Sequence, residues 1–130
     1  MRDHLRKRAR DRGQAAIEYL GFLPLLLIVG LAGLQLGIAA YAAQQAGTAA
    51  RAAARAATTD EENAPDCRTA GRAAVSGWVD PQIEGCGGEG GEAAVITVRV
   101  EIPPVLPFWD FDPVVKTATM PRTPPTEDDE

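Results

Sequence analysis

An apolar stretch near the N-terminus constrains this chain more than any other feature. From Ile17 to Ala43, Glu18 and Gln35 are the only strongly polar side chains. A helix rises 1.5 Å per residue, so this run of about 27 residues would be roughly 40 Å long. That length is enough to cross a hydrocarbon layer of about 30 Å with some tilt. The stretch therefore predicts one transmembrane helix.

A cleavable secretory signal is the alternative interpretation of this stretch. Such a signal has an apolar region of about 7–15 residues that ends at a small-x-small cleavage site. The apolar run here is longer, and alanine is so abundant after Ile38 that an Ala-x-Ala match carries little information. We therefore favour a membrane helix that is retained.

Charge is distributed unevenly on the two sides of this helix. The net charge is −5, yet residues 1–13 are rich in arginine and residues 127–130 are all acidic. A basic segment beside a membrane span is typical of cytoplasmic retention. No recognition helix or platform of aromatic residues accompanies this segment, so the sequence does not indicate nucleic-acid binding. We therefore predict a solvated, basic cytoplasmic leader over 1–13 and a disordered acidic tail over 122–130.

An alanine-rich stretch continues the helix beyond the membrane. Residues 44–58 are mostly alanine, the strongest helix former, and Arg51 and Arg55 share one helical face. Residues 14–58 are therefore expected to form one helix. The smooth alanine surface suits close packing against similar helices or against the chain's own domain, and a solvated rigid stalk is the alternative.

Residues 59–121 are predicted to form a small extracytoplasmic domain. Its clearest element is a strand over 94–102, and a second strand over 114–120 is expected to pair with it in antiparallel fashion. A short helix over 69–79 precedes them. The fold class is α+β, with a long N-terminal transmembrane helix and a small domain containing a short helix and an antiparallel hairpin or small sheet. The apolar face of the first strand comprises Ile96, Val98, Val100 and Ile102.

The chain has two cysteines, Cys67 and Cys86, and both follow the apolar stretch. If the basic leader stays inside, they lie outside the cell membrane, where disulfides persist. A bridge closing a loop of about 18 residues would contribute roughly 3 kcal/mol in the chain-entropy model. We favour this disulfide, with free thiols and a metal or redox site as the alternatives.

The residues available for catalysis are few. The single histidine, His4, lies in the basic leader, so a serine or cysteine triad cannot be assembled, and two cysteines with one distant histidine do not make a zinc site. Asp110 and Asp112 indicate a surface turn rather than a calcium loop. Trp109 and Phe111 are expected to cap the small core rather than bind a ligand. We predict no enzyme activity, cofactor, metal or small-molecule substrate.

Glu18 is the remaining residue that invites a functional explanation. A carboxylate costs about 2.5–3.5 kcal/mol at the centre of a bilayer and less near its interface. If the peptide bond after Gly13 were cut, the new amine of Gln14 would lie one helical turn from Glu18, at the positive end of the helix dipole. The alternative is an interfacial glutamate without a role.

Two further features of the apolar stretch bear on helix packing. Pro24 lies within the first turns and is expected to kink or loosen the helix, which neighbouring helices can accommodate. Gly33 and Gly37 have the small-xxx-small spacing that permits close contact between membrane helices. Ordinary glycine usage in a membrane helix is the alternative.

Together these residues resemble a known family. The basic segment, Gly13, small residues, Glu18 and the apolar helix resemble the class III leader of type IV pilins. Glu18-Tyr19 is similar to the Glu-Tyr or Glu-Phe pair of the Flp/Tad (tight adherence) branch. Pro24, followed by three leucines, and the Ala/Arg-rich run after Gln44 resemble TadE-like pseudopilins in particular. The resemblance covers residues 10–58 well and the C-terminal part loosely.

The resemblance implies a pilin-like helix and a role in assembling or initiating Tad-type adhesion pili. It implies cleavage by a prepilin peptidase between Gly13 and Gln14, and partners among Tad/Flp assembly proteins and other pilin-like subunits, reached through the N-terminal helix. Gln14 stands where other type IV pilins usually have phenylalanine. The alternative is a membrane-anchored extracytoplasmic interaction module whose helix is only an anchor.

Overall fold

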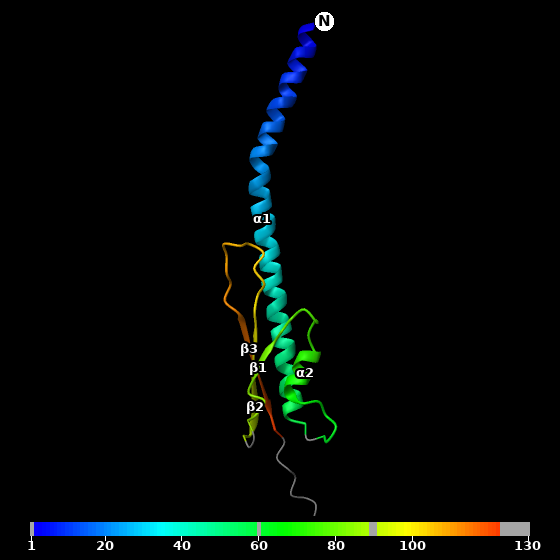
Figure 1. Cartoon of the computed structure of the whole chain (residues 1–130), viewed down its shortest axis with the longest axis vertical. Coiled ribbons are helices and arrows are strands. Elements are labelled where there is room, and N and C mark those ends of the chain that lie inside the picture. Colours follow the sequence, from blue (N-terminus) through cyan, green and yellow to red (C-terminus); the bar gives the residue numbers. More distant parts are fainter. Residues whose placement is uncertain (1, 60, 89–90, 123–130) are drawn as a thin grey trace, which may run out of the picture.

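The computed structural model describes residues 2–59, 61–88 and 91–122, with side chains described from residue 13 onward, so residues 123–130 of the predicted acidic tail lie outside it. Figure 1 shows the short elements gathered beside the C-terminal half of the long helix, whose N-terminal half projects alone. The predicted α+β class is confirmed. The elements are α1 (Arg2–Ala57), α2 (Cys67–Ala73), β1 (Gln82–Glu84), β2 (Ala93–Val100) and β3 (Val114–Pro121).

α1 extends further toward the N-terminus than expected. α1 begins at Arg2, so the helix includes most of the basic leader. Arginine, lysine, alanine and glutamine are strong helix formers, and adding residues to an existing helix costs far less than starting a new one. Pro24 lies inside α1, which continues through it with a gentle curve rather than a break (Figure 1).

The three strands form one antiparallel sheet in the order β1-β2-β3. Ile96 of β2 pairs with Ala118 of β3, so the predicted hairpin is confirmed. β1 was not predicted, because its three residues are too few to show an alternating pattern; its Ile83 pairs with Val98 of β2. Ile102, expected on the buried face of the strand, lies beyond its end and is partly buried.

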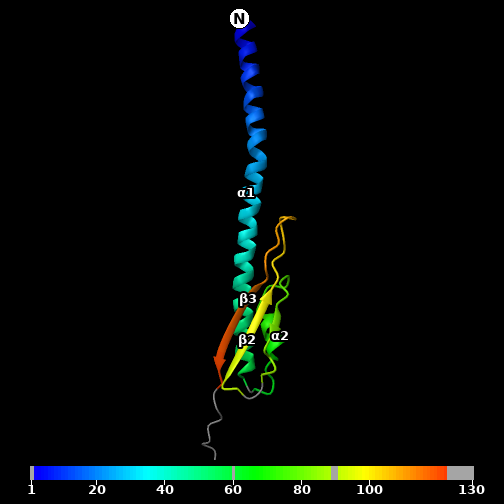
Figure 2. The same cartoon turned by 90° about the vertical axis from the view of Figure 1, so that its left-hand side faces the viewer.

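The core lies between the sheet, α2 and one face of α1 (Figure 2). Aliphatic side chains of the sheet, among them Ile96 and Val98, fill it from one side and are fully buried. α1 faces them with small side chains, which let the sheet lie close to the helix backbone. The alanine-rich run therefore packs against the chain's own domain and is not a solvated stalk. Its buried members are Ala42, Ala46, Ala49, Ala50, Ala53 and Ala54.

α2 packs closely on α1 through small residues. A Cβ added to Gly71 of α2 would collide with Cδ1 of Ile83. It would also lie 3.2 Å from the Cβ of Ala53 and 3.3 Å from the backbone oxygen of Ala49, both on α1. Protein interiors are so densely packed that even one added methyl group displaces the neighbouring atoms. Gly71 is therefore needed for the spacing of the two helices.

α2 is shorter than the helix predicted over 69–79, because it begins at Cys67 and ends at Ala73. Beyond it, the backbone amide of Ser76 donates a hydrogen bond of 3.2 Å to Oε1 of Gln45 on α1. The Ser76 amide is therefore bonded to α1, whereas in a longer α2 it would donate to a carbonyl four residues earlier in the same helix. The contact with α1 therefore accompanies the early end of α2.

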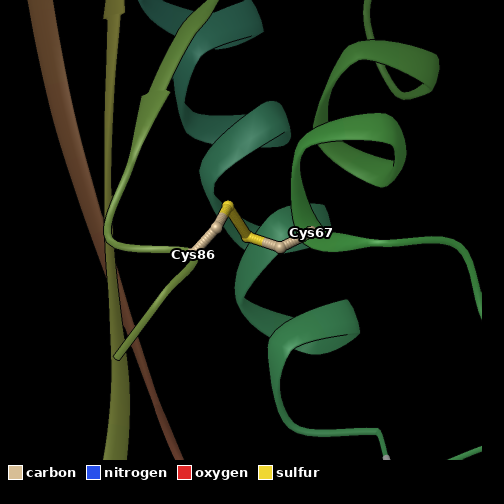
Figure 3. Close-up of a disulfide and its surroundings, with 2 residues drawn as sticks. All are labelled: Cys67 and Cys86. Carbon is tan, nitrogen blue, oxygen red and sulfur yellow. A yellow bond between two sulfur atoms is a disulfide. The ribbon is translucent and has the colours of Figure 1, made fainter. Parts of the chain in front are cut away.

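A disulfide joins Cys67 and Cys86, as predicted, and it excludes the free-thiol and metal alternatives for these two residues. Their Cα atoms are 5.6 Å apart and their separation in sequence is 19 residues. Figure 3 shows the bridge running from the first residue of α2 to the turn that follows β1. The crosslink thus ties α2 to the sheet on the side where both lie against α1.

Candidate functional site

The N-terminal half of α1 is apolar and is not covered by the rest of the chain. Every residue from 13 to 31 is exposed, including large side chains such as Phe22, Leu26 and Ile28. Within the described residues, one helix is long and apolar enough to cross a membrane. A helix that is apolar all round is stable only when lipid or other protein surrounds it. This surface is therefore the principal candidate for function.

The residues predicted to direct processing all lie on this exposed half of α1. Gly13, Gln14, Glu18, Tyr19 and Pro24 are exposed, and all five belong to one continuous helix. Gln14 and Glu18 are four residues apart and so lie on the same face of α1, as the sequence required. The structure thus brings the proposed cut and the carboxylate to one helical turn. Their roles in processing and assembly stay predictions.

The predicted helix-packing glycines are also open. A Cβ added to Gly33 or Gly37 would meet no described atom within 4 Å. Together with Leu34, Ile38 and Trp78 they line a shallow hollow on the side of α1. The small-xxx-small face is therefore open within the described residues, and its role in helix packing stays a prediction.

Gln35 is a structural residue that sequence reasoning passed over. Its side chain is 1% exposed, although it lies in the apolar stretch. Nε2 donates a hydrogen bond of 3.3 Å to the backbone oxygen of Pro103, and Oε1 accepts one of 2.7 Å from the backbone amide of Val105. These bonds hold the connection between β2 and β3 against α1. The signal in the sequence was a lone amide in an apolar run, since a buried amide requires partners.

Replacing Gln35 with leucine should release this connection, because the amide of Val105 and the carbonyl of Pro103 would lose their partner. An unsatisfied buried polar group costs about 1–3 kcal/mol. We expect the hydrogen-exchange protection of the Val105 amide to fall by about tenfold or more, since about 1.4 kcal/mol is a factor of ten. Gln44→Leu, at an exposed position of α1, is the control and should leave the protection unchanged. Equal protection in the Gln35 variant would show that this clamp contributes little.

A second contact between α1 and the domain involves aromatic rings. The rings of Tyr41 and Trp78 are stacked, with centroids 5.5 Å apart and planes 14° from parallel. The Tyr41 hydroxyl and the Ser76 hydroxyl are 2.6 Å apart and share a hydrogen bond. Trp78 was expected inside the short helix, but it lies in the segment after α2. This segment is thereby fixed to α1 about two turns beyond Gln35.

Trp109 and Phe111 do not cap the core, so that prediction is wrong for these residues. Their rings stack on each other at 5.8 Å, and Trp109 remains 53% exposed. They belong to the connection between β2 and β3, which runs beside α1 beyond the end of the sheet (Figure 1). The buried residue of this connection is Leu106 instead. Asp110, expected in a surface turn, is exposed.

Comparison with known proteins finds a family match within α1. Residues 13–55 match the model of the family of TadE-like proteins, and this part of the chain is a TadE-like domain. The family comprises pseudopilins of the Tad pilus system, which are generally structural proteins rather than enzymes. Searches of the curated proteins and of the solved structures found no match to the chain.

Proposed function

We propose, from the TadE-like domain at residues 13–55, that this chain is a minor pseudopilin-like subunit that helps to assemble or initiate Tad-type adhesion pili. α1 anchors it in the membrane, with residues 1–13 in the cytoplasm and the α2–sheet domain on the extracytoplasmic side. A prepilin peptidase cuts between Gly13 and Gln14 to give the mature subunit.

The extent of the family match is the observation that carries this proposal. The match begins at Gly13, the residue before the proposed cut, and ends at Arg55, near the end of α1. It therefore includes both the exposed apolar half and the alanine-rich half of one helix. The chain's own domain covers only the second half, which leaves the first free for lipid or for the helices of other pilin-like subunits.

The position of Glu18 fits a role after cleavage. Removal of residues 1–13 creates an amine on Gln14, one helical turn from the Glu18 carboxylate. The positive amine and the positive end of the helix dipole both favour the charged carboxylate in an apolar setting. The amine can belong to the same subunit or to a neighbour, so Glu18 can set the register between packed helices.

The cleavage prediction is tested by intact-mass measurement in a host with an active prepilin peptidase. The wild-type chain should lose residues 1–13, and Gly13→Leu should retain them. Gly21→Leu is the matched control, because an added Cβ meets no described atom within 4 Å at either glycine. That control should be processed normally. A wild-type chain that keeps residues 1–13 in this host would contradict the proposal.

Glu18→Ala, examined in the same host, distinguishes the proposal from a simple membrane-anchored interaction module. We expect the variant to insert in the membrane but to lower the number of surface pili seen by electron microscopy. An anchor would tolerate the change, since removing a carboxylate makes insertion more favourable. Unchanged piliation would favour the anchor.

A further inference from the structure

The connection between β2 and β3, residues 101–113, has an apolar segment that is left in solvent. None of residues 102–109 is charged, and Glu101 and Asp110 flank them. Phe108 is 76% exposed and Trp109 is 53% exposed, whereas the neighbouring Leu106 is buried. Two large exposed aromatic side chains in succession, on a segment that has not collapsed onto its own core, indicate contact with something apolar.

The position of this segment identifies what it contacts. The hydrogen bonds of Gln35 to Pro103 and Val105 fix it beside α1 at the level of residue 35. Figures 1 and 2 both show the connection reaching past the sheet along α1, toward the projecting half of the helix. About 20 helical residues cross a hydrocarbon layer of about 30 Å. A span that starts soon after Gln14 therefore ends near residue 35, at the height of this segment.

Part of the backbone of the segment is also suited to a site with little water. Three of its residues, Pro103, Pro104 and Pro107, have no N–H group to satisfy. The amide of Val105 is bonded to Gln35, and the amide of Trp109 donates a hydrogen bond of 3.1 Å to the backbone oxygen of Leu106. Backbone donors must find partners inside the protein wherever water is scarce.

We propose that residues 102–109 insert their aromatic tip into the interfacial layer of the same bilayer that α1 crosses. Tryptophan and other amphipathic aromatic side chains are enriched at this layer. The insertion seats the domain on the membrane and continues the lipid-facing surface of α1 onto the loop. The inference rests on the proposed membrane insertion of α1, but it does not depend on a role in pili.

The test uses the full chain reconstituted in vesicles of phosphatidylethanolamine and phosphatidylglycerol that carry bromine at a shallow acyl position. The chain has two tryptophans, so Trp78→Phe leaves Trp109 as the single tryptophan, which is excited selectively at wavelengths that tyrosine does not absorb. We expect its emission to shift to the blue relative to free tryptophan and to be strongly quenched by the brominated lipid. In the background without Trp78 and Trp109, Thr119→Trp is the matched control, at an exposed site on the distant end of β3, and should not be quenched.

A third reporter separates this proposal from the membrane anchor itself. Leu20→Trp in the same background places a tryptophan on the exposed apolar half of α1, about 9 Å along the helix from Gln14 and so near the brominated acyl position. If this tryptophan is quenched while Trp109 is not, α1 spans the membrane but residues 102–109 do not insert, which would refute the proposal. If neither tryptophan is quenched, both the membrane insertion of α1 and the insertion of residues 102–109 are refuted. If Trp109 is shielded from aqueous acrylamide but is not quenched by the brominated lipid, it contacts protein instead of lipid. That result would also refute the insertion of residues 102–109.

Discussion

Removing the disulfide with Cys67→Ala and Cys86→Ala should lower the free energy of unfolding of the domain by about 2–5 kcal/mol. The bridge closes a loop across a separation of 19 residues and ties α2 to the turn after β1. The domain it holds has a small core, to which α1 contributes only alanines. Small domains depend on crosslinks because they bury too little apolar surface to be stable without them. A large effect is therefore expected.

The measurement is denaturant unfolding of the full chain in detergent, followed by near-ultraviolet circular dichroism from its tryptophans. Reduction of the wild-type chain with dithiothreitol is the control, because it breaks the same bond without changing any side chain. The reduced wild type and the double variant should unfold at similar denaturant concentrations. If both unfolded with the oxidised wild type, the disulfide would contribute nothing to stability.

Ala53→Leu should be the most disruptive single substitution on α1, with a loss of about 1–3 kcal/mol or more. Ala53 is fully buried, and the site of a Cβ on Gly71 lies 3.2 Å from its own Cβ. A leucine there has no space unless α2 moves away, and the bridge at Cys67 opposes that movement. We expect a lower unfolding midpoint and loss of the Tyr41–Trp78 stacking signal in near-ultraviolet circular dichroism.

Ala73→Leu provides the matched control for this prediction. It adds the same three carbons to a helix, but at an exposed position of α2. Its unfolding midpoint should stay close to that of the wild type, since exposed substitutions usually change stability by no more than about 0.5 kcal/mol. Equal effects of the two substitutions would show that close packing of α1 on α2 is not the cause.

The features that followed from local pattern were predicted well. α1 came from a long apolar run joined to alanines, β2 from its alternation, and the disulfide from the only two cysteines. β1 was missed because its three residues are too few to show an alternating pattern, and the end of α2 was missed because a contact with another element accompanies it. Ser76, for example, bonds Gln45 on a different element. No sequence window contains both partners.

The candidate site also has some features that follow from local sequence pattern and others that depend on residues distant in sequence. The exposure and common face of Gln14 and Glu18 follow directly from helical spacing. The burial of Gln35 does not, because its partners Pro103 and Val105 lie 68 and 70 residues away in sequence. Trp109 was expected to cap the core, but it lies exposed on the connection that Gln35 bonds to α1.

Because α1 is one continuous helix, it also fixes the rotational orientation of the domain about the helix axis relative to the membrane-facing half. A flexible linker between the two would leave that orientation free. Each helical residue turns the chain by about 100° and advances it by 1.5 Å. The number of residues between the exposed face at Gly33 and the buried alanine stripe therefore sets the azimuth at which the sheet faces a neighbouring molecule. Because the domain packs along the helix instead of hanging from its end, a rotation or axial pull applied to the membrane half reaches the domain without a swivel to absorb it.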